Sequence, residues 1–581
     1  MVAGVRHRYG APITVGPCSP AAPLTGPMRS RDALIESSTS PPALQLQPAA
    51  PTIPTCHDAS RIWLPDVVQR FATLLAPNEV ACAMRLVNKA TAAQFHGPQH
   101  TSVRLSQPVP HHAFVWRWAG TDAMRRLTAR DRRALPRLTA RSGSIANLEV
   151  LLARDASGLE AADVQAVIES AAEAGQLDVC AWLRQRGWPL GPKLLDAAAG
   201  GGQQAVYEWL LVNGCPKGDE VEAAARAAMR GHEGMMDWLL LGGSAPGETS
   251  VEALEALLRA AAAGCALSAL ERLHHTYLDS RGRELSLESQ QAVLSAAVQS
   301  PTSDWRAKVE WLEARGYPRT IHACGAAVAM PGALPRLQWL QQQGYSLGQR
   351  AAHNAASGGN VEALRYVLGQ QGSGYRGESL MAGAAHGGHV AVMEVLHEYG
   401  IPAGVYATES AAGGGHLPAV AWLVERLGAG AALTTGVFAA AARAGSMELL
   451  VWLRARGCPW DAATFAVVAG DGSEEQLEWL AEQGCPMGDD GYPYVWAAAT
   501  GHLEMLRCLR RLGCPWSPGG STFASLLEWL NAGLDANVER ALCWLLDQGC
   551  PVDWDQAVTI ARQVRNKELF EWLGTQRQQR A

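Results

Sequence analysis

One pattern recurs along most of this chain, from about residue 170 to the C-terminus. Its clearest copy runs from Val495 to Leu509 and is followed by Gly513-Cys514-Pro515-Trp516. A unit this short cannot bury its own apolar face, so it becomes stable only by stacking on its neighbours. The repeat therefore predicts an array with a long exposed surface, and the default role of such a surface is binding.

Each unit is marked by an aromatic or apolar residue that is followed by Leu in all but one copy. Most successive markers lie 27 to 30 residues apart, and the gap of 73 residues before Trp311 predicts a degenerate unit around Leu270 and Leu273. The count is then about fourteen units. The markers are Trp182, Trp209, Trp238, Trp311, Trp339, Tyr366, Val395, Trp422, Trp452, Trp479, Cys508, Trp544 and Trp572. The stretch from Tyr277 to Gln290 is expected to interrupt the stack.

The residues before each marker predict a helical hairpin. A Gly stands seven residues before most markers and follows an Ala-rich run such as Ala497-Ala498-Ala499. The Ala-rich run predicts a short first helix, the Gly its end, and the stretch up to the marker a second helix with apolar residues three and four apart. These glycines are Gly175, Gly202, Gly231, Gly359, Gly388, Gly415, Gly445, Gly472 and Gly501.

A second glycine ends the second helix. It occurs as Gly-Cys-Pro at Gly214, Gly457, Gly484, Gly513 and Gly549. Gly adopts the left-handed cap without strain, and Pro stops the helix from continuing. Four Gly-His pairs, at His232, His389, His416 and His502, precede the second helix, and we expect these His side chains to hydrogen-bond at its exposed start.

These units resemble ankyrin repeats. The closest match is Gly501-His502-Leu503-Glu504, but where that family has Thr-Pro-Leu-His this sequence has Tyr492-Pro493-Tyr494-Val495. The units are also shorter than the family's ~33 residues. The resemblance implies an all-α, right-handed solenoid of about fourteen short ankyrin-like hairpins over residues 142–581, with the family's β-hairpin fingers trimmed or lost.

Bulk properties narrow the function classes. The net charge is −6 and the isoelectric point about 6.3, from which we expect no nucleic acid partner. No run of about eighteen apolar residues occurs, so we expect no membrane span. We also expect the chain to be a monomer. The 13 Cys include five in equivalent Gly-Cys-Pro positions, which indicate small buried apolar residues in a reducing, intracellular compartment, cytoplasmic or nuclear. Zinc or redox work is the alternative.

The N-terminal 58 residues hold ten Pro and no apolar period, which predicts a disordered tail. The first 31 residues contain four Arg and no acidic residue before position 32, so an organelle transit peptide is the alternative.

Residues 59–100 have a different pattern. Leu64-Pro65 is expected to open a helix with an apolar face, and Pro77-Asn78 a second helix that carries Arg85 to Lys89 at its far end. This segment resembles an F-box, a helical motif that docks on the adaptor subunit of cullin-RING ubiquitin ligases. The resemblance implies adaptor contacts by Leu64, Pro65, Val67, Phe71, Leu75, Leu86 and Val87. The alternative is a helix pair that caps the first repeat.

Residues 101–141 are expected to form an arginine-rich linker or cap. Seven arginines lie between Met124 and Arg141. Such a run can address the nucleus or an acidic partner, but it is more often a solvated face.

Nothing in the sequence has the spacing of a catalytic group. There is no phosphate loop, no His-Glu-x-x-His and no Gly-x-Ser-x-Gly, and the His pairs at His111 and His274 lack ligand partners at suitable spacing. We therefore predict no catalytic residue, no cofactor, no metal ligand and no enzyme activity. A sphingomyelin phosphodiesterase-related lipid hydrolase is the weakest alternative, because it needs carboxylates and His gathered around a metal ion.

The sequence thus predicts a protein-interaction scaffold whose array binds a protein partner of unknown identity. The alternative is an F-box-type substrate receptor of a cullin-RING ubiquitin ligase. Expected anchors in the array are the aromatic residues between units, Trp188, Trp460, Trp516 and Trp554, for which packing on the next repeat is the other interpretation.

Overall fold

The computed structural model describes residues 64–120, 122–154, 161–242, 250–330, 332–371, 377–529, 536–563 and 567–580. Regular structure in these residues is helical throughout, without a strand, as the trimmed repeats predict. The chain divides into two compact units, residues 1–114 and 115–581, each treated by itself below. The predicted tail over residues 1–58, with its transit-peptide alternative, lies outside the described residues.

The first unit is a small helical module. Its elements are α1 (Pro65–Leu74), α2 (Pro77–Cys82), the 3₁₀ turn η2 (Met84–Leu86), α3 (Lys89–Gln94) and α4 (Pro98–Thr101). Val68 of α1, Val80, Met84 and Phe95 form its buried core. Prolines open α1 and α2 as predicted, because Pro at the first helical position costs no hydrogen bond.

The second helix ends earlier than the sequence suggested. α2 stops at Cys82, and a new helix, α3, begins at Lys89. The residue before it, Asn88, accepts a hydrogen bond at its Oδ1 from the Thr91 N–H at 2.8 Å. An Asn at the N-cap position stabilises a helix start in this way. Arg85 to Lys89 therefore lie on η2 and the start of α3.

The second unit is a helical-hairpin solenoid. After α5 (His111–Trp118), the described part of this unit holds thirty helices from α6 to α36, with the short α26 (Ala429–Ala432) left out, and they follow one another as fifteen pairs. The first helices are α6 (Ala129–Arg141), α8 (Ala161–Glu173), α10 (Lys193–Gly200), α12 (Glu220–Met229), α14 (Val251–Gly264), α16 (Leu287–Val298), α18 (Ala323–Val328), α20 (Gln349–Ser357), α22 (Glu378–His386), α24 (Val405–Gly413), α27 (Thr435–Ala444), α29 (Ala462–Asp471), α31 (Tyr492–Ala499), α33 (Ser521–Trp529) and α35 (Trp554–Gln563).

The second helices carry the markers. They are α7 (Ile145–Arg154), α9 (Leu177–Gln185), α11 (Gln204–Val212), α13 (Glu233–Gly242), α15 (Leu267–Tyr277), α17 (Trp305–Ala314), α19 (Ala333–Gln342), α21 (Val361–Gln371), α23 (Val390–Glu398), α25 (Leu417–Leu427), α28 (Met447–Ala455), α30 (Glu474–Glu482), α32 (Leu503–Arg511), α34 (Ala536–Asp547) and α36 (Lys567–Arg580). Every predicted marker lies on one of them. The pair α6–α7 is additional, because Val150 stands at its marker position, seven residues after Gly143.

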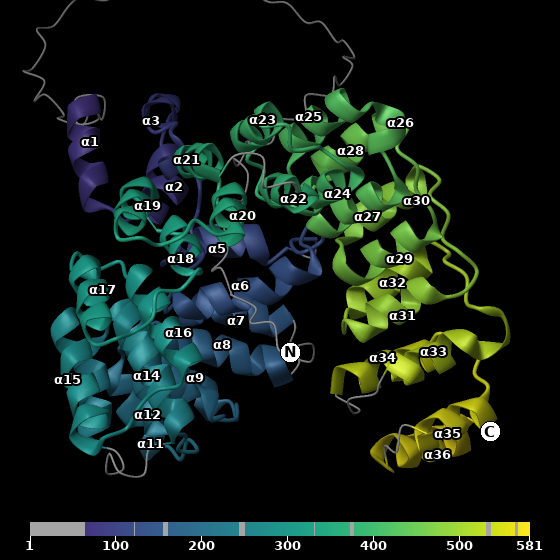
Figure 1. Ribbon diagram of the computed structural model, residues 1–581. Coiled ribbons are helices and arrows are strands. Elements are labelled where there is room, and N and C mark those ends of the chain that lie inside the picture. The colour runs from purple at the N-terminus through teal and green to yellow at the C-terminus, as the bar shows by residue number, and fades with distance from the viewer. Residues whose placement is uncertain are drawn as a thin grey trace, which may run out of the picture. The chain divides into compact units, whose positions relative to one another are not determined.

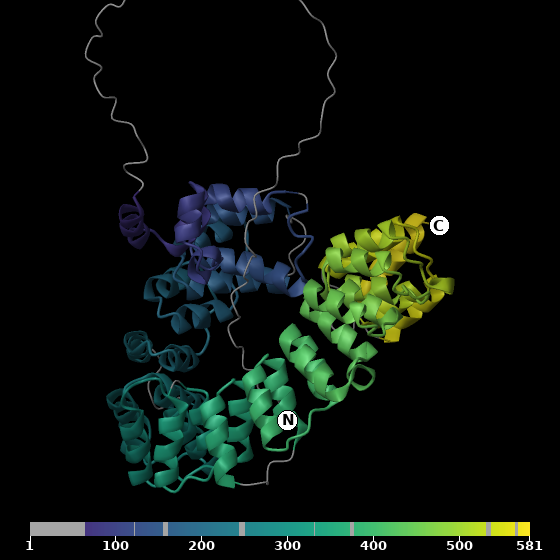
Figure 2. The ribbon, with the colours of Figure 1, turned by 90° about the horizontal axis from the view of Figure 1, so that it is seen from above.

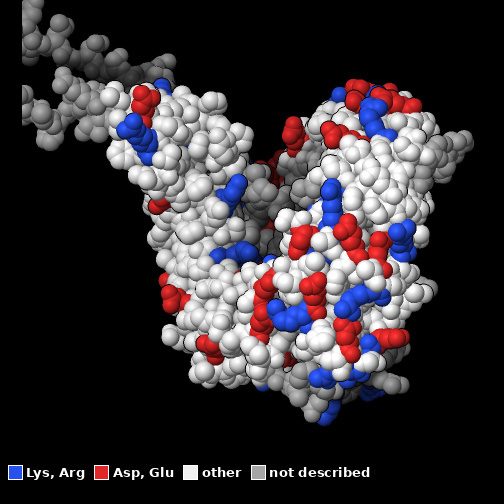
Figure 3. Space-filling model, turned by 60° about the vertical axis from the view of Figure 1, so that its left-hand side comes forward, with Lys and Arg blue, Asp and Glu red and all other residues white. Residues whose placement is uncertain are grey.

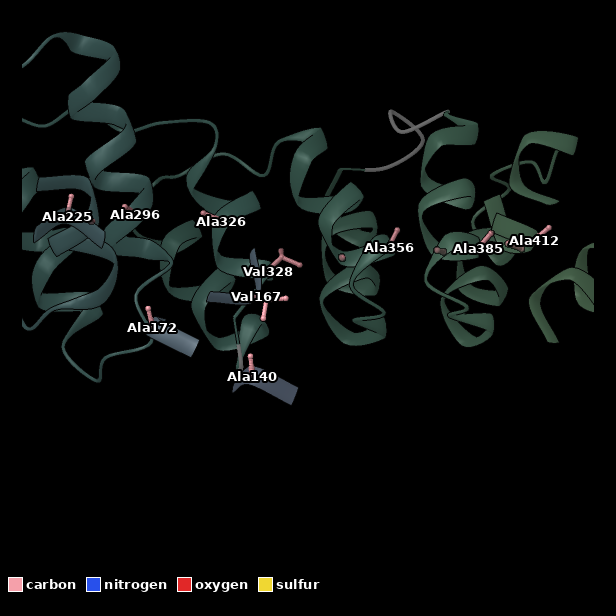
Figure 4. Packing of buried hydrophobic residues seen from close by; sticks show 14 of the residues in the cluster. Ala140, Val167, Ala172, Ala225, Ala296, Ala326, Val328, Ala356, Ala385 and Ala412 are labelled. Atoms are coloured by element: carbon pink, nitrogen blue, oxygen red, sulfur yellow. The ribbon is translucent and has the colours of Figure 1, made fainter. Parts of the chain in front are cut away.

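First helices pack side by side along the array, as Figures 1 and 2 show for α12, α14 and α16 and for α22, α24 and α27. The small side chains of the Ala-rich runs lie buried between them (Figure 4), so neighbouring helices can approach closely. One apolar core runs from Ala140 to Leu573. The stack is not interrupted after Tyr277, because α14 packs on α16 and Tyr277, Leu278 and Leu285 join the same core.

Both repeated glycines end helices as predicted. Gly388 ends α22 with φ of 70°, and the N–H groups of Gly388 and His389 donate to the carbonyls of Ala385 and Ala384, each at 3.0 Å. Gly484 ends α30 with φ of 79°, and the Cys485 N–H donates to the Leu480 carbonyl at 2.9 Å. This bonding satisfies carbonyls that a helix end would otherwise leave unpaired.

The repeated His does not hydrogen-bond at the start of the second helix, as the sequence led us to expect. The side chains of His389, His416 and His502 make no such cap. Instead the His416 ring covers Gly388 of the preceding unit, where an added Cβ would lie 2.5 Å from the ring. His389 covers Gly359 and His232 covers Gly202 in the same way. At each of these glycines, a side chain of the next unit thus occupies the space that a Cβ would need, and we call such a position a glycine seat.

Candidate partner-binding surfaces

The residues expected to contact an adaptor lie on one exposed face of α1 and on η2. Leu64, Phe71 and Leu75 are 53%, 49% and 39% exposed, although all three are apolar. Val68, at the edge of the same face, is buried in the core of the first unit. Helical spacing puts these four residues on one side of α1. The core of the first unit thus uses Val68 of this face and leaves Leu64, Phe71 and Leu75 exposed.

The other residues of that set are arranged around this face. Pro65 begins α1 and is exposed, and Val67 beside it is half-buried. Leu86 and Val87, at the end of η2, are exposed apolar side chains. α3 is tied to the start of α1, because Gln94 Nε2 donates to the Pro65 carbonyl at 2.9 Å.

Three of the four expected array anchors, Trp188, Trp460 and Trp516, lie in loops between helices, and Trp554 is the first residue of α35. All four are half-buried against the core of the array. Trp460 makes edge contacts with Phe438 at 5.3 Å and with Trp479 at 6.3 Å between ring centroids. Trp516 lies against Tyr494 at 3.9 Å. Contact of the exposed ring edges of these tryptophans with a partner stays a prediction.

The remaining two anchors pack in a similar way. Trp554 contacts Phe523 with ring centroids 6.4 Å apart. Trp188 follows Gly187, where α9 ends, and packs against the array core. The rings of Trp460 and Trp554 therefore contribute to the packing of one unit on the next, and all four rings keep part of their surface accessible.

The marker tryptophans have a structural role that the spacing alone did not show. An arginine four residues later lies over the ring in several second helices, with Arg456 3.7 Å from the Trp452 centroid and Arg426 3.7 Å from that of Trp422. Residues four apart face each other on a helix, and a guanidinium is attracted to an aromatic face. The pair covers the outer side of the marker ring.

The arginines between Met124 and Arg141 are more than a solvated face: Arg126 is 74% exposed and Arg130 is exposed, but six of the seven pair with an acidic side chain. Arg137 Nη2 lies 3.0 Å from Asp163 at the start of α8, and Arg141 Nη1 lies 3.1 Å from Glu173 at its end. Arg125, Arg126 and Arg132 pair with carboxylates of α30, far along the chain. The run is therefore a set of contacts within the second unit.

Two polar groups inside the array escaped sequence reasoning. Lys308 is fully buried, and its Nζ donates to Ser300 Oγ at 2.8 Å, to Thr302 Oγ1 at 2.9 Å and to the carbonyls of Ala262 and Cys265. These carbonyls end α14. Burial lowers the pKa of Lys308, and Asp304 nearby opposes that change.

The second group surrounds His274. Its Nε2 lies 3.0 Å from Tyr317 Oη, and its Nδ1 lies 3.1 Å from Asp279. Burial lowers the pKa of His274, while the Asp279 carboxylate acts in the opposite direction. In the sequence, His274 stood out only as one of two adjacent His residues. Its hydrogen-bond partner Tyr317 comes 43 residues later, so no local pattern indicated the contact. In the described residues, no group of three or more His, Cys, Asp or Glu is placed to hold a metal ion.

No protein-family model and no curated protein matches the chain. Among solved structures, it is similar to the pentatricopeptide repeat protein PPR10 from maize, with 14% identity, 76% of this chain and 79% of that chain covered, and a TM-score of 0.23. It is also similar to PPR10 in complex with an 18-nt psaJ RNA element, with 12% identity, coverage of 88% and 89%, and the same TM-score of 0.23. At these values the likeness assigns neither a family nor a partner.

The exclusion of nucleic acid as a partner was wrong and is withdrawn, because two of the matched structures hold the 18-nt RNA element on a pentatricopeptide repeat protein. A net charge averages over the whole chain, whereas a partner meets a local group of side chains. On the face that Figure 3 shows, basic and acidic side chains are interspersed. Within the described residues, no helix has both the length and the apolar character needed to cross a membrane.

Proposed function

We propose that this chain is a protein-interaction scaffold whose hairpin array binds a protein partner. The observation that carries the proposal is a set of exposed apolar side chains at the starts of four first helices, which we call the first-helix rim. It consists of Val251 on α14, Leu287 on α16, Val405 and Tyr406 on α24, and Tyr492 on α31.

The rim recurs at one place in the repeat. Successive first helices pack side by side and run in the same direction, so their starts lie along one edge of the array. Single exposed apolar residues are ordinary on a protein surface. Repetition at equivalent positions is typical of an extended recognition surface, in which a few aromatic or aliphatic side chains act as anchors. The array contributes binding to the proposed function and no chemical step.

The test compares one triple variant and one double variant of the full chain. Leu287→Ser, Tyr406→Ser and Tyr492→Ser together alter the rim. Val212→Ser with Leu241→Ser alter apolar residues that are even more exposed, near the ends of second helices α11 and α13. Partners recovered by affinity purification should be lost with the rim variant and kept with the control. The affinity of a purified partner for the rim variant should fall at least about tenfold.

Loss of the partner with both variants, or with neither, would show that the rim is not the binding surface. Circular dichroism on each variant provides the folding control, since all five side chains are exposed and their replacement should leave the helix content unchanged.

We propose, as the second candidate, a substrate receptor of F-box type in a cullin-RING ubiquitin ligase. The exposed apolar face of Leu64, Phe71 and Leu75 favours it, because the core of the first unit leaves these side chains accessible to a partner. The array would then hold a target protein near the ubiquitin-transfer machinery and contribute proximity.

Phe71→Ser with Leu75→Ser separates the two candidates. These substitutions leave the core residues Val68, Val80 and Met84 in place. Adaptor and cullin subunits should co-purify with the unmodified chain and be absent with the variant, whereas array partners should remain with both. Absence of the adaptor from the unmodified chain would remove this candidate and leave the scaffold.

A further inference from the structure

The arginine-rich segment before and within α6 lies against hairpins α29–α30 and α31–α32, more than three hundred residues later in the chain. Arg132 Nη2 donates to Glu474 Oε1 at 2.9 Å across a sequence separation of 342. Arg126 Nε lies 3.3 Å from Glu475 Oε1, and Arg125 pairs with Glu478. Three arginines of the segment thus pair with three carboxylates in the first turns of α30.

Backbone groups at two helix ends also take part. The Glu475 N–H, in the first turn of α30, donates to the Arg125 carbonyl at 3.2 Å. Arg133 Nη2 donates to the carbonyl of Thr500, which ends α31, at 3.1 Å. N–H groups at a helix start and carbonyls at a helix end lack partners within the helix. The segment supplies a partner to one group of each kind: the Arg125 carbonyl accepts from the Glu475 N–H, and the Arg133 side chain donates to the Thr500 carbonyl.

The middle of the segment packs against a glycine, Gly445, through the side chain of Thr128. Thr128 Cγ2 would lie 2.5 Å from a Cβ added to Gly445, and Thr128 is buried. In the hairpins around Gly359 and Gly388 this seat is filled by the His of the next unit. The next unit here has Ser473 in that position, and its side chain accepts the Gln476 N–H within its own helix start. Gly445 is therefore left open for a side chain from elsewhere.

The electrostatics of the contact suit a basic occupant. The side chains of Arg132 and Glu474 are only 14% and 15% exposed, so their pair is partly shielded from water. His502, on the same surface, has its pKa lowered to about 3 by burial and by the charges of Arg132 and Arg133. A neutral imidazole lies beside two guanidinium groups without repulsion, and its Nδ1 has no hydrogen-bond partner.

The contact is additional to the stack. α29 packs on α27 and on α31, as first helices do throughout the array. Leu127, Thr128 and Ala129 of the segment are buried, but its contacts with α30 and Thr500 are ion pairs and hydrogen bonds. Such contacts are weakened by salt and exchange with competing ligands more readily than buried apolar packing does. Its place can therefore be taken by another segment of the same chemistry without loss of the hairpins beneath it.

We propose that Gly445, Glu474, Glu475, Glu478 and Thr500 form a recognition surface for an arginine-bearing segment, occupied in cis by residues 125–133. The class of partner is a protein that presents the pattern Arg-x-x-Thr-x-x-x-Arg-Arg, as Arg125, Thr128, Arg132 and Arg133 do here. The proposal rests on the proposed scaffold function and specifies one surface for it. In the isolated chain this surface is autoinhibited, because the tethered segment competes at high effective concentration.

The test uses the full chain and a fluorescein-labelled peptide with the sequence of residues 122–134. The variant Arg125→Glu/Arg132→Glu releases the segment in cis. Its affinity for the peptide, measured by fluorescence anisotropy, should exceed that of the unmodified chain at least about tenfold and fall as the salt concentration rises. Adding Glu474→Lys and Glu475→Lys to the released variant should abolish binding.

A second readout reports on the segment itself. Hydrogen exchange at the Glu475 amide should be faster in the released variant, while the amides of α27 and α31 keep their protection. Equal peptide affinities for the released and unmodified chains, or binding that survives the two lysine substitutions, would overturn the proposal. If the peptide fails to bind while the rim variant still loses its partner, this inference alone falls and the scaffold function stands.

Discussion

At the scale of single residues, Gly388 shows why the repeat keeps glycine before His. Its φ is 70°, and the His416 ring occupies the space of an added Cβ. Sequence reasoning explained this glycine by the helix end alone, because nothing local indicates that a side chain 28 residues later covers it. The sequence therefore predicted that a glycine is needed for the left-handed backbone at this position, but not that the His416 ring packs against it.

Gly388→Ala should lower the stability of the chain by about 1–3 kcal/mol, because a left-handed residue with a Cβ is strained and the His416 ring has to move. Gly234→Ala is the matched control, since Gly234 lies in α13 with open space around it and an ordinary φ. That change should be neutral or stabilise by about 0.5–1 kcal/mol. Urea unfolding followed by circular dichroism measures both midpoints, and a lower midpoint for the control would contradict the explanation.

The repeated cysteines are buried thiols of low reactivity. Burial raises the pKa of Cys458, Cys485, Cys514 and Cys550 to about 12. Because the thiolate is the reactive form, an alkylating reagent near pH 8 should modify these four more slowly than the half-buried Cys543. Mass spectrometry of digests gives the rates, and denaturant should equalise them. Equal rates in the folded chain would contradict the burial.

At the scale of helices, Lys308 closes the end of α14, where this hairpin has Cys265 and Ala266 in place of the usual Gly-His. Lys308→Met should cost about 2–4 kcal/mol, because it leaves buried carbonyl and hydroxyl groups without their donor. Lys217→Met is the control. Lys217 pairs with Glu220 at 2.5 Å but is 58% exposed, so its loss should cost less than about 1 kcal/mol. Hydrogen exchange should show faster opening of α14 and α17 in the first variant only.

The hairpin α31–α32 should lose stability as the pH falls from 7 to 5. The pKa of His502 is about 3 in the folded chain, below the ordinary value of 6.5, so the unfolded chain binds more protons between these values. Stability is then fully present above pH 6.5 and declines below it. His502→Gln should flatten this dependence in thermal melts between pH 5 and 7. An unchanged slope in the variant would show that other groups cause it.

At the scale of the whole molecule, the two units have separate cores. The first is built on Val68, Val80, Met84 and Phe95, and the second runs from Ala140 to Leu573. A fragment of residues 115–581 should therefore keep its helix content and melt within a few degrees of the full chain, because each core carries its own stability. Thermal denaturation by circular dichroism tests this, and loss of helix in the fragment would show that the first unit is required.

The sequence by itself determined the helical hairpin, both glycine turns and the number of units to within one. These features depend on residues within about ten positions of each other, whose backbone preferences act locally. Only the tertiary structure showed that Thr128 fills the seat at Gly445, that Lys308 reaches the carbonyls of α14, and that the apolar face of α1 is exposed. Such contacts join residues far apart in the chain, and the packing that brings them together leaves no local pattern.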